Sequence, residues 1–233
     1  NLMKAIILAG GRGTRLPNSA SLIPKSLVVV DGKPIIQHQI ELLQKHGLSD
    51  IRLSLGYKAD QIIAYLDHKY EYVVENEPLG TGGAIKFASE DLEEPFMVLN
   101  GDIISNLDVG AFVSQNKAGT SSIAIAYQQK NTDYGLITLD RHGRIKQFLE
   151  KPRTPADGYV SVGFYILNPH IFKRIDKKSF SIEYDVFPEL AAEGYLHGFR
   201  HSGFWIDLGT ENRVSFMKHV AENARVTIFS VPH

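Results

Sequence analysis

The stretch Met3–Lys25, MKAIILAGGRGTRLPNSASLIPK, decides how the rest of the sequence is interpreted. The apolar run Ala5–Leu8 predicts a buried strand, and Ala9-Gly10-Gly11 predicts its end. A glycine-rich loop with two arginines, Arg12 and Arg15, follows. Glycines allow backbone N–H groups to approach an anion closely, and neighbouring cations neutralise its charge. The stretch therefore predicts a polyphosphate-binding loop at the carboxyl end of a strand.

Two common phosphate-binding loops are excluded by the spacing of these glycines. A Walker loop has four residues between its glycines and then Gly-Lys-Ser/Thr, and the sequence contains no such string. The dinucleotide fingerprint places glycine at its first, third and sixth positions. Counted from Gly11, the third position is Gly13 but the sixth is Leu16. The loop therefore belongs to neither class.

Composition narrows the class of protein. The 233 residues are 43% hydrophobic and 22% charged, which is ordinary for a globular protein. A net charge of −1 gives no electrostatic basis for binding nucleic acid or a membrane, so we expect neither partner. The absence of cysteine excludes disulfides, zinc–thiolate sites and a cysteine nucleophile, and fits a cytoplasmic protein. The apolar run 2–9 is too short for a membrane span.

Alternating strands and helices are predicted for the first half of the chain. Apolar, β-branched runs indicate strands, and apolar residues at helical spacing indicate helices between them. This alternation predicts an α/β fold: a Rossmann-like, mostly parallel sheet wrapped by helices, with ligands at the carboxyl ends of the strands. The predicted strands after the first are residues 27–30, 51–55, 72–75 and 95–99, and the predicted helices begin at Pro34, before Ile62 and in the run 78–83.

The second half has a different pattern. Short strand-like runs separated by turns occupy residues 121–127, 135–139, 145–149 and 159–167. They predict a smaller, antiparallel lobe that completes the ligand pocket. Helical spacing returns around residues 186–191 and 214–221. No linker or repeat divides the chain, so we expect a single domain over residues 1–233.

Five stretches, taken in order, resemble the sugar-1-phosphate nucleotidylyltransferases. The first is the opening glycine loop with Pro-Lys behind it, and the others are EPLGTGG (77–83), LNGD (99–102), FLEKP (148–152) and FWIDLGT (204–210). An aspartate at a strand end is often only a turn residue, and a lone Glu-Lys pair is usually solvated, so the resemblance rests on the ordered set of motifs. Members of this family join a nucleoside triphosphate to a sugar 1-phosphate and release pyrophosphate. The resemblance implies a nucleotide-binding part over about 1–105 and a sugar-binding part over about 106–220.

The resemblance also implies roles for individual residues. It implies Mg²⁺ as the cofactor, with Asp102 and Asp207 as its ligands. The implied catalytic residues are Arg15, Lys25, Asp102, Lys151 and Asp207. The implied nucleotide-binding residues are Leu8, Ala9, Gly10, Gly11, Gly13, Thr14, Glu75, Glu77, Gly80 and Thr81. The implied sugar-phosphate-binding residues are Gly135, Glu150, Lys151, Ser161 and Gly163.

The chemistry of this reaction needs no general base. Its nucleophile is a phosphate oxygen of the sugar 1-phosphate, which is already ionised because the second phosphate pKa is about 6. The obstacle is repulsion between two polyanions, which positioning and charge neutralisation must overcome. On this basis Arg15 holds the triphosphate, Lys25 contacts oxygens near the reacting phosphorus, and Lys151 attracts the sugar phosphate. Carboxylates such as Asp102 and Asp207 suit Mg²⁺, which is a hard cation.

The nucleotide is predicted from the loop at residues 77–83. Its EPLGT string resembles guanylyltransferases more than thymidylyltransferases, so GTP is favoured. Guanine offers adjacent donors, N1–H and N2–H, to one carboxylate, whereas uracil and thymine offer a single N–H. Glu75 or Glu77 could accept from guanine, or both could be exposed loop charges. A uridylyl- or thymidylyltransferase acting on another hexose 1-phosphate is the alternative.

The sugar is predicted from the runs NEPLGTGGAIK (76–86) and KSFSIEYD (178–185). They resemble heptose 1-phosphate guanylyltransferases of surface-polysaccharide synthesis, with mannose 1-phosphate enzymes as the near alternative. Ser161 departs from the pattern, because this family usually has asparagine there. A catalytically silent, nucleotide-sugar-sensing relative is a rival, as is a molybdopterin guanylyltransferase, which would leave the runs 150–152 and 205–207 unexplained. The resemblance also allows a homodimer, which is common among similar enzymes.

The two aspartates are expected to meet in space. Asp102 and Asp207 each follow a short apolar run, 96–99 and 204–206. Strands of one parallel sheet can bring such ends together at its carboxyl edge. We therefore expect both carboxylates within joint reach of one Mg²⁺ ion.

Overall fold

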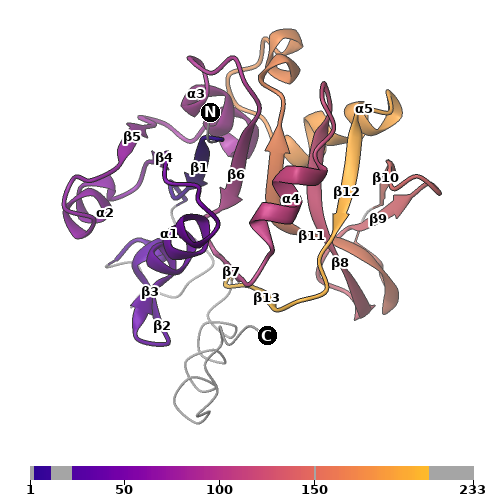
Figure 1. Cartoon of the computed structure of the whole chain (residues 1–233), viewed down its shortest axis with the longest axis horizontal. Helices are drawn as coiled ribbons and strands as arrows, with labels where there is room; N and C mark the ends of the chain where they lie inside the picture. The colour runs from indigo at the N-terminus through magenta and orange to yellow at the C-terminus, as the bar shows by residue number, and fades with distance from the viewer. Residues whose placement is uncertain (1–2, 12–22, 150, 210–233) are drawn as a thin grey trace.

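The fold is organised around β1 (Ala5–Leu8), the strand predicted from the opening stretch. The computed structural model describes residues 3–11, 23–149 and 151–209. β1 lies between β4 (Ile51–Leu55) and β6 (Phe96–Asn100), and β5 (Glu71–Val74) lies beyond β4. All of these neighbours are parallel (Figure 1). The predicted Rossmann-like, parallel core is confirmed.

Helices cover both faces of this sheet. The alternating side chains of β1 show how, because Ile7 packs in the core on one face and Ile6 packs in the core on the other. The first long helix ends at Lys45, and Gly47 follows its cap residue with a φ of +81°, which suits glycine just after a helix C-terminus. The helices on the Ile7 face are α1 (Ile35–Lys45), α2 (Ala59–Tyr65) and α4 (Val109–Gln115), and those on the Ile6 face are α3 (Gly80–Ala88) and α5 (Phe187–Ala192).

The second half of the chain joins the same sheet through β11 (Ala156–Leu167). β11 runs antiparallel to β6 on one side and to β8 (Ser121–Asn131) on the other. β12 (Leu196–Arg200) then pairs in parallel with β8. β9 (Leu136–Leu139) and β10 (Ile145–Leu149) complete a nine-stranded sheet within the described ranges. The predicted antiparallel lobe is therefore continuous with the parallel core.

A separate two-stranded sheet is formed by β7 (Ile103–Ser105) and β13 (Trp205–Asp207), which run antiparallel. It lies below β1 and β6 in Figure 1, at the end toward which β1 runs. The expectation that Asp207 ends a strand of the parallel sheet is therefore wrong. β7 follows β6 after a short loop, and its backbone pairs with this later segment.

Smaller elements differ from the sequence predictions in detail. The predicted strand 27–30 is instead a 3₁₀ turn, Lys25–Leu27, followed by a hairpin of β2 (Val29–Val30) and β3 (Lys33–Pro34). A π-helix, Ile182–Val186, precedes α5, and a 3₁₀ helix, Pro169–Arg174, follows β11. β7, β12 and α4 were not predicted, and the predicted helix at 214–221 lies outside the described residues. Within the described ranges, none of the helices has the length and apolarity to span a bilayer.

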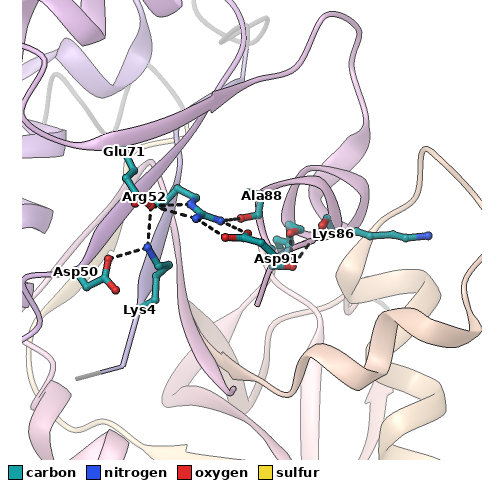
Figure 2. A network of polar contacts seen from close by, with 9 residues as sticks. Lys4, Asp50, Arg52, Glu71, Lys86, Ala88 and Asp91 are labelled. Atoms are coloured by element: carbon teal, nitrogen blue, oxygen red, sulfur yellow. Dashed lines mark hydrogen bonds and ion pairs between the residues drawn. The ribbon is translucent and has the colours of Figure 1, made fainter. Parts of the chain in front are cut away.

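The amino edge of the parallel strands carries a network of ion pairs (Figure 2). Arg52 on β4 is its centre, and its two terminal nitrogens contact the two carboxylate oxygens of Asp91 at 2.5 and 2.8 Å. Arg52 also donates to the carbonyl of Ala88 at 2.8 Å, which ties β4 to the end of α3. Glu71 on β5 accepts from both Arg52 (3.1 Å) and Lys4 (2.8 Å). This edge is therefore closed by mutually paired charges.

Candidate functional site

The glycine loop begins at the carboxyl edge of the sheet, where β1 ends. The N–H of Ala9 donates to the carbonyl of Ser54 at 2.8 Å, which fixes the loop to β4. A Cβ atom at Gly10 would lie 3.1 Å from Glu75 Oε1, so the close packing here favours glycine. Among the other residues predicted for this loop, Leu8 and Gly11 lie at the same edge, whereas Gly13, Thr14 and Arg15 lie outside the described residues.

Glu75 follows β5 and lies against this loop. Its Oε2 atom is buried and has no hydrogen-bond partner among the described residues. Burial raises the pKa of the Glu75 carboxyl, and a hydrogen bond from the backbone N–H of Leu79 partly opposes that rise. A buried acceptor without a protein donor is the kind of group that an N–H of a ligand would satisfy.

Glu77, the other candidate acceptor for a nucleotide base, has a different environment. It is exposed and forms an ion pair with Lys178. The hydrogen bond from Lys178 lowers the pKa of Glu77. The structure therefore brings Glu75 to the glycine loop and leaves Glu77 at the surface.

A bracing segment, residues 178–182, packs on the start of α3. The N–H of Gly82 donates to the carbonyl of Phe180 at 2.9 Å. The hydroxyl oxygen of Thr81 accepts from the N–H of Ile182 at 3.0 Å. The segment thus holds the loop that the sequence assigns to the nucleotide.

The glycines of that loop have a packing requirement of their own. A Cβ atom at Gly80, Gly82 or Gly83 would overlap the bracing segment. Gly80 also has a φ of +69°, which L-residues rarely adopt. Sequence reasoning assigned the loop 77–83 to the nucleotide, with Gly80 as a named contact, and missed the segment that its glycines accommodate. The contacts of Gly80 and Thr81 with a nucleotide remain a prediction.

Lys25 and Asp102 form an ion pair beside the end of β1. Lys25 Nζ lies 2.7 Å from Asp102 Oδ2, and the two side chains are 17% and 31% exposed. Lys25 begins the 3₁₀ turn after the opening stretch, and Asp102 lies in the loop between β6 and β7. Two residues predicted separately as catalytic are thus in direct contact.

The loop that carries Asp102 is fixed from two sides. Gln39 of α1 is buried, and its Nε2 donates to the carbonyls of Asn100 (2.8 Å) and Ile103 (2.9 Å). A Cβ atom at Gly101 would overlap the carbonyl oxygen of Leu8, so the loop also packs directly on the end of β1. The Asp102 backbone is therefore held in place from both flanks.

Asp207 reaches the same loop through β13. It is paired with Ile103 across the small sheet, and the N–H of Leu208 donates to the carbonyl of Asp102 at 2.7 Å. Its Oδ1 accepts from the N–H of Gly209 at 2.5 Å, and its Oδ2 accepts from the hydroxyl of Tyr134 at 3.2 Å. The two aspartates are thus neighbours, although through antiparallel pairing and not through a shared parallel sheet.

The donor set at this place fits a magnesium ion. The described residues include no group of three or more His, Cys, Asp or Glu side chains able to hold a metal. Asp102 and Asp207 nevertheless give two hard oxygen ligands on adjacent backbone segments. Mg²⁺ is commonly bound by one or two carboxylates, with its other ligands coming from water and substrate phosphates. Joint coordination by this pair remains a prediction.

The predicted sugar-phosphate residues lie on the antiparallel lobe. Lys151 is exposed two residues after the end of β10, and Glu150 lies outside the described residues. A Cβ atom at Gly135 would come within 2.8 Å of the carbonyl oxygen of Leu149, so the β8–β9 turn packs against the end of β10. Gly135 and Lys151 therefore flank one strand end.

Ser161 and Gly163 lie in an irregular part of β11, where its register with β8 shifts. The hydroxyl of Ser161 accepts from the N–H of Gly163 at 3.2 Å. Gly163 has a φ of +76°, and a Cβ atom there would lie 3.0 Å from Asn100 Nδ2. This part of the lobe therefore borders the Asp102 loop.

A fully buried hydroxyl links these parts. Tyr165 of β11 donates to Glu183 Oε1 at 2.7 Å and accepts from Asn100 Nδ2 at 3.2 Å. Burial, with the Glu183 carboxylate beside it, raises the pKa of Tyr165 well above its ordinary value. The network joins the π-helix to the residue before Gly101, and so supports the Asp102 loop from a third side.

Four residues of this site were missed by sequence reasoning: Gln39, Asn100, Tyr134 and Glu183. One of them had a usable signal. Gln39 lies on the apolar face of α1 beside Ile36 and Ile40, and a polar side chain on a buried helical face usually has a specific partner. The other three have no such local signal, and their partners, like those of Gln39, lie elsewhere in the sequence.

Comparison with known proteins identifies the family. The family model described as Nucleotidyl transferase matches residues 4–222. The chain belongs to this family. The match includes the glycine loop, both aspartates and the antiparallel lobe, so it extends over the whole site.

Curated relatives in this family carry more specific names. Mannose-1-phosphate guanyltransferase of Aspergillus fumigatus is 38% identical over 221 residues, which are 89% of this chain and 61% of the relative. A probable mannose-1-phosphate guanylyltransferase 2 of Arabidopsis thaliana is 35% identical over 224 residues, which are 89% of this chain and 62% of that protein. The chain therefore spans about three fifths of the length of these relatives.

Solved structures give the same fold. HddC from Yersinia pseudotuberculosis, complexed with GMP-PN, superposes with a TM-score of 0.81 at 33% identity, covering 94% of this chain and 99% of HddC. A putative glucose-1-phosphate thymidylyltransferase from Bacillus anthracis has a TM-score of 0.83 at 22% identity, covering 97% of both chains. The second likeness, at that identity, concerns the fold alone.

Proposed function

We propose that this chain transfers a nucleotidyl group from a nucleoside triphosphate, preferably GTP, to a sugar 1-phosphate. The observation that carries the proposal is the convergence of Lys25, Asp102 and Asp207 at the carboxyl edge of the sheet, next to the glycine loop. A cation and two carboxylates beside a loop of closely packed backbone are what a reaction between two polyanions needs.

In the proposed reaction, a phosphate oxygen of the sugar 1-phosphate forms a bond to the α-phosphorus of the triphosphate. The bond between that phosphorus and the bridging oxygen to the β-phosphorus breaks, and pyrophosphate leaves with the electron pair. Lys25 and Arg15 stabilise charge on the triphosphate, and Lys151 holds the sugar phosphate. Mg²⁺ held by Asp102 and Asp207 would neutralise charge on the phosphates.

Gln39 preorganises the loop that carries Asp102. It holds the Asp102 loop by two hydrogen bonds to backbone carbonyls, so the carboxylate does not have to be positioned during the reaction. Because the attacking phosphate is already ionised, no side chain has to remove a proton. The network on Tyr165 and Glu183 supports the same loop and lies close to the bracing segment.

The preference for GTP rests on Glu75 and on the relatives. Glu75 lies beside the glycine loop, and its buried Oε2 atom has no hydrogen-bond partner among the described residues. A carboxylate can accept from the N1–H and N2–H donors of guanine together. The curated relatives are named as guanylyltransferases, and the HddC complex contains a GMP-based ligand. We infer that Glu75, and not Glu77, recognises the base.

The sugar is proposed to be mannose 1-phosphate or a heptose 1-phosphate. The names of the curated relatives favour mannose, and the runs 76–86 and 178–185 favour heptose. The hydroxyl of Ser161 bonds its own strand at the N–H of Gly163, so a sugar contact would use its remaining hydrogen-bonding capacity. We also propose that the protein is cytoplasmic and that it forms a homodimer.

The test combines each nucleoside triphosphate with each sugar 1-phosphate and measures the rate of pyrophosphate release. GTP, UTP, dTTP and ATP are each combined with mannose, heptose and glucose 1-phosphates in the presence of Mg²⁺. We expect the highest kcat/KM with GTP and with mannose or heptose 1-phosphate. Higher kcat/KM with UTP or dTTP would overturn the assignment of GTP. No pyrophosphate from any pair would favour the silent, nucleotide-sugar-sensing relative.

A further inference from the structure

Tyr134 joins the antiparallel lobe to the second aspartate. Its hydroxyl donates to Asp207 Oδ2 at 3.2 Å. Its ring lies 5.5 Å from the ring of Trp205, tilted by 57°, and Trp205 is in the same short strand as Asp207. The tyrosine therefore contacts β13 both through its ring and through its hydroxyl.

The turn that carries Tyr134 is built to hold it. Asn131 is buried at the end of β8, and its Oδ1 accepts from the N–H groups of Asp133 (3.1 Å) and Tyr134 (3.0 Å). Its Nδ2 donates to the carbonyl of Tyr134 at 2.7 Å. Both backbone polar groups of Tyr134 are thus bonded to one buried side chain. Its orientation toward Asp207 follows from a fixed turn and not from a free surface side chain.

The same turn reaches the predicted sugar-phosphate site on its other side. Gly135 directly follows Tyr134 and packs against the carbonyl of Leu149 at the end of β10. The exposed cation Lys151 comes two residues after Leu149. One turn therefore lies between the residues predicted to bind the sugar phosphate and a carboxylate predicted to bind the metal.

We propose that Tyr134 is a positioning residue that orients Asp207 for the metal and couples sugar-phosphate binding to metal binding. The proposal rests on the proposed function, because it takes Asp207 as a ligand. Groups that hydrogen-bond a ligating side chain fix its orientation, and their loss typically weakens metal binding about 10–100-fold. Coupling is reciprocal, so sugar phosphate that settles this turn strengthens metal binding, and the metal strengthens sugar-phosphate binding by the same factor.

Tyr134→Phe tests the proposal, because it removes the hydroxyl and keeps the ring on Trp205. Mn²⁺ replaces Mg²⁺ as the probe, and its dissociation constant is measured by electron paramagnetic resonance with an unreactive α,β-methylene analogue of GTP. The titration is repeated with mannose 1-phosphate or heptose 1-phosphate, whichever the substrate matrix identifies. Trp205, the single tryptophan of the chain, gives a parallel fluorescence signal from the strand of Asp207.

The matched control is Tyr127→Phe, on β8, the strand that leads into the turn of Tyr134. Tyr127 is 56% exposed, and its ring packs on Tyr159 and not on β13. We expect Tyr134→Phe to weaken Mn²⁺ binding about 10–100-fold and to lose the strengthening by sugar phosphate. Turnover of the variant should recover as Mg²⁺ is raised. Tyr127→Phe should match the wild type in each measurement.

Three outcomes would overturn the proposal, and each is distinguishable. If the wild type releases pyrophosphate while Tyr134→Phe binds Mn²⁺ within twofold of it, Tyr134 does not position Asp207. If Mn²⁺ binding weakens but sugar phosphate still strengthens it as in the wild type, the coupling is wrong. If the wild type neither releases pyrophosphate from any substrate pair nor binds Mn²⁺ with the analogue, the proposed function fails and the proposal fails with it.

Discussion

The two edges of the main sheet both carry charged side chains, but the charges are arranged differently. At the amino edge, Arg52 and Lys4 share Glu71, and Arg52 holds both oxygens of Asp91 (Figure 2). At the carboxyl edge, and among the described residues, Asp102 forms one ion pair, with Lys25, and a buried oxygen of Glu75 has no hydrogen-bond partner. One edge is saturated by its own charges, and the other has bonding capacity for a ligand.

The difference shows that a shifted pKa is a poor guide to function by itself. The hydrogen bond from Arg52 lowers the pKa of Asp91 to about 2, yet this pair ties β4 to the residues after α3, far from the glycine loop. Structural ion pairs shift pKa values too, and not only groups in active sites. Convergence of residues from distant segments, together with an unsatisfied buried acceptor, is the better indicator here. The following predictions test this division between the edges.

The largest effect is expected from removing either carboxylate of the proposed metal site. Asp102→Asn or Asp207→Asn keeps the side-chain shape but loses the charge, so kcat/KM should fall by at least about 100-fold, since a metal supplies several kcal/mol of charge stabilisation. Pyrophosphate release and thermal unfolding are measured together. Asp91→Asn is the control at the amino edge and should retain activity. If the Asp102 or Asp207 variant keeps activity within tenfold of the wild type, the carboxyl edge is not the reactive edge of the sheet.

A smaller loss is expected from Gln39→Leu. This change leaves the carbonyls of Asn100 and Ile103 unpaired and frees the Asp102 loop, so activity at a fixed Mg²⁺ concentration should fall about 10–100-fold. The Mg²⁺ concentration for half-maximal rate should rise. Gln37→Leu, on the same helix but bonded to Glu41 at the surface, is the control. An unchanged Mg²⁺ dependence would mean that Gln39 is only structural.

Arg52→Met should lower stability and leave the chemistry intact. It removes the Arg52 hydrogen bonds to the Ala88 carbonyl and to Asp91, at a cost of about 1–3 kcal/mol, whereas Glu71 keeps its contact with Lys4. Because the pKa of Asp91 is lowered in the folded state, this stabilisation is fully present above about pH 4 and is lost as the pH falls toward 2. Calorimetry should show a lower Tm at pH 7 and a shrinking difference in acid. A normal Tm together with an impaired kcat would mean that the amino edge serves the reaction and not the stability of the fold.

The smallest effect on stability is expected from Glu75→Gln. This change should raise the Tm, whereas Arg52→Met should lower it. Burial raises the pKa of Glu75, so the ionised carboxylate costs stability as the pH rises above its unfolded value of about 4.3. Glutamine removes this cost, so Tm at pH 7 should rise slightly while the KM for GTP increases. The Tm difference should vanish below about pH 4. Glu77→Gln is the control, and a larger KM change there would make Glu77 the base-recognising residue.

The sequence predicted the parts of the fold that depend on local pattern. The strand Ala5–Leu8, which ends before Ala9-Gly10-Gly11, and the strands 51–55 and 145–149 lie where apolar periodicity and turn residues predicted them. Asp102 was placed correctly at the end of β6 for the same reason. Local patterns decide these features because strand propensity and chain reversal are short-range properties.

The contacts that shape the site depend on long-range pairing, which local patterns do not encode. Asp207 reaches the Asp102 loop through β7, a strand that was not predicted. The loop 77–83 was assigned to the nucleotide, but the bracing segment packs on its glycines at 80, 82 and 83. Tyr134 gave no signal of its own, since its partner lies on another strand far along the chain. In each case the deciding neighbour comes from a distant part of the sequence.

The pairing of β7 with β13 also sets the order in which the site can be made. β7 emerges from the ribosome with the parallel strands, whereas β13 is synthesised after the whole antiparallel lobe. A nascent chain therefore completes β1, β4 and β6 without yet having its second aspartate. Since translation adds about 5–20 residues each second, the two aspartates are made seconds apart. Products released before residue 205 would carry only half of the proposed metal site.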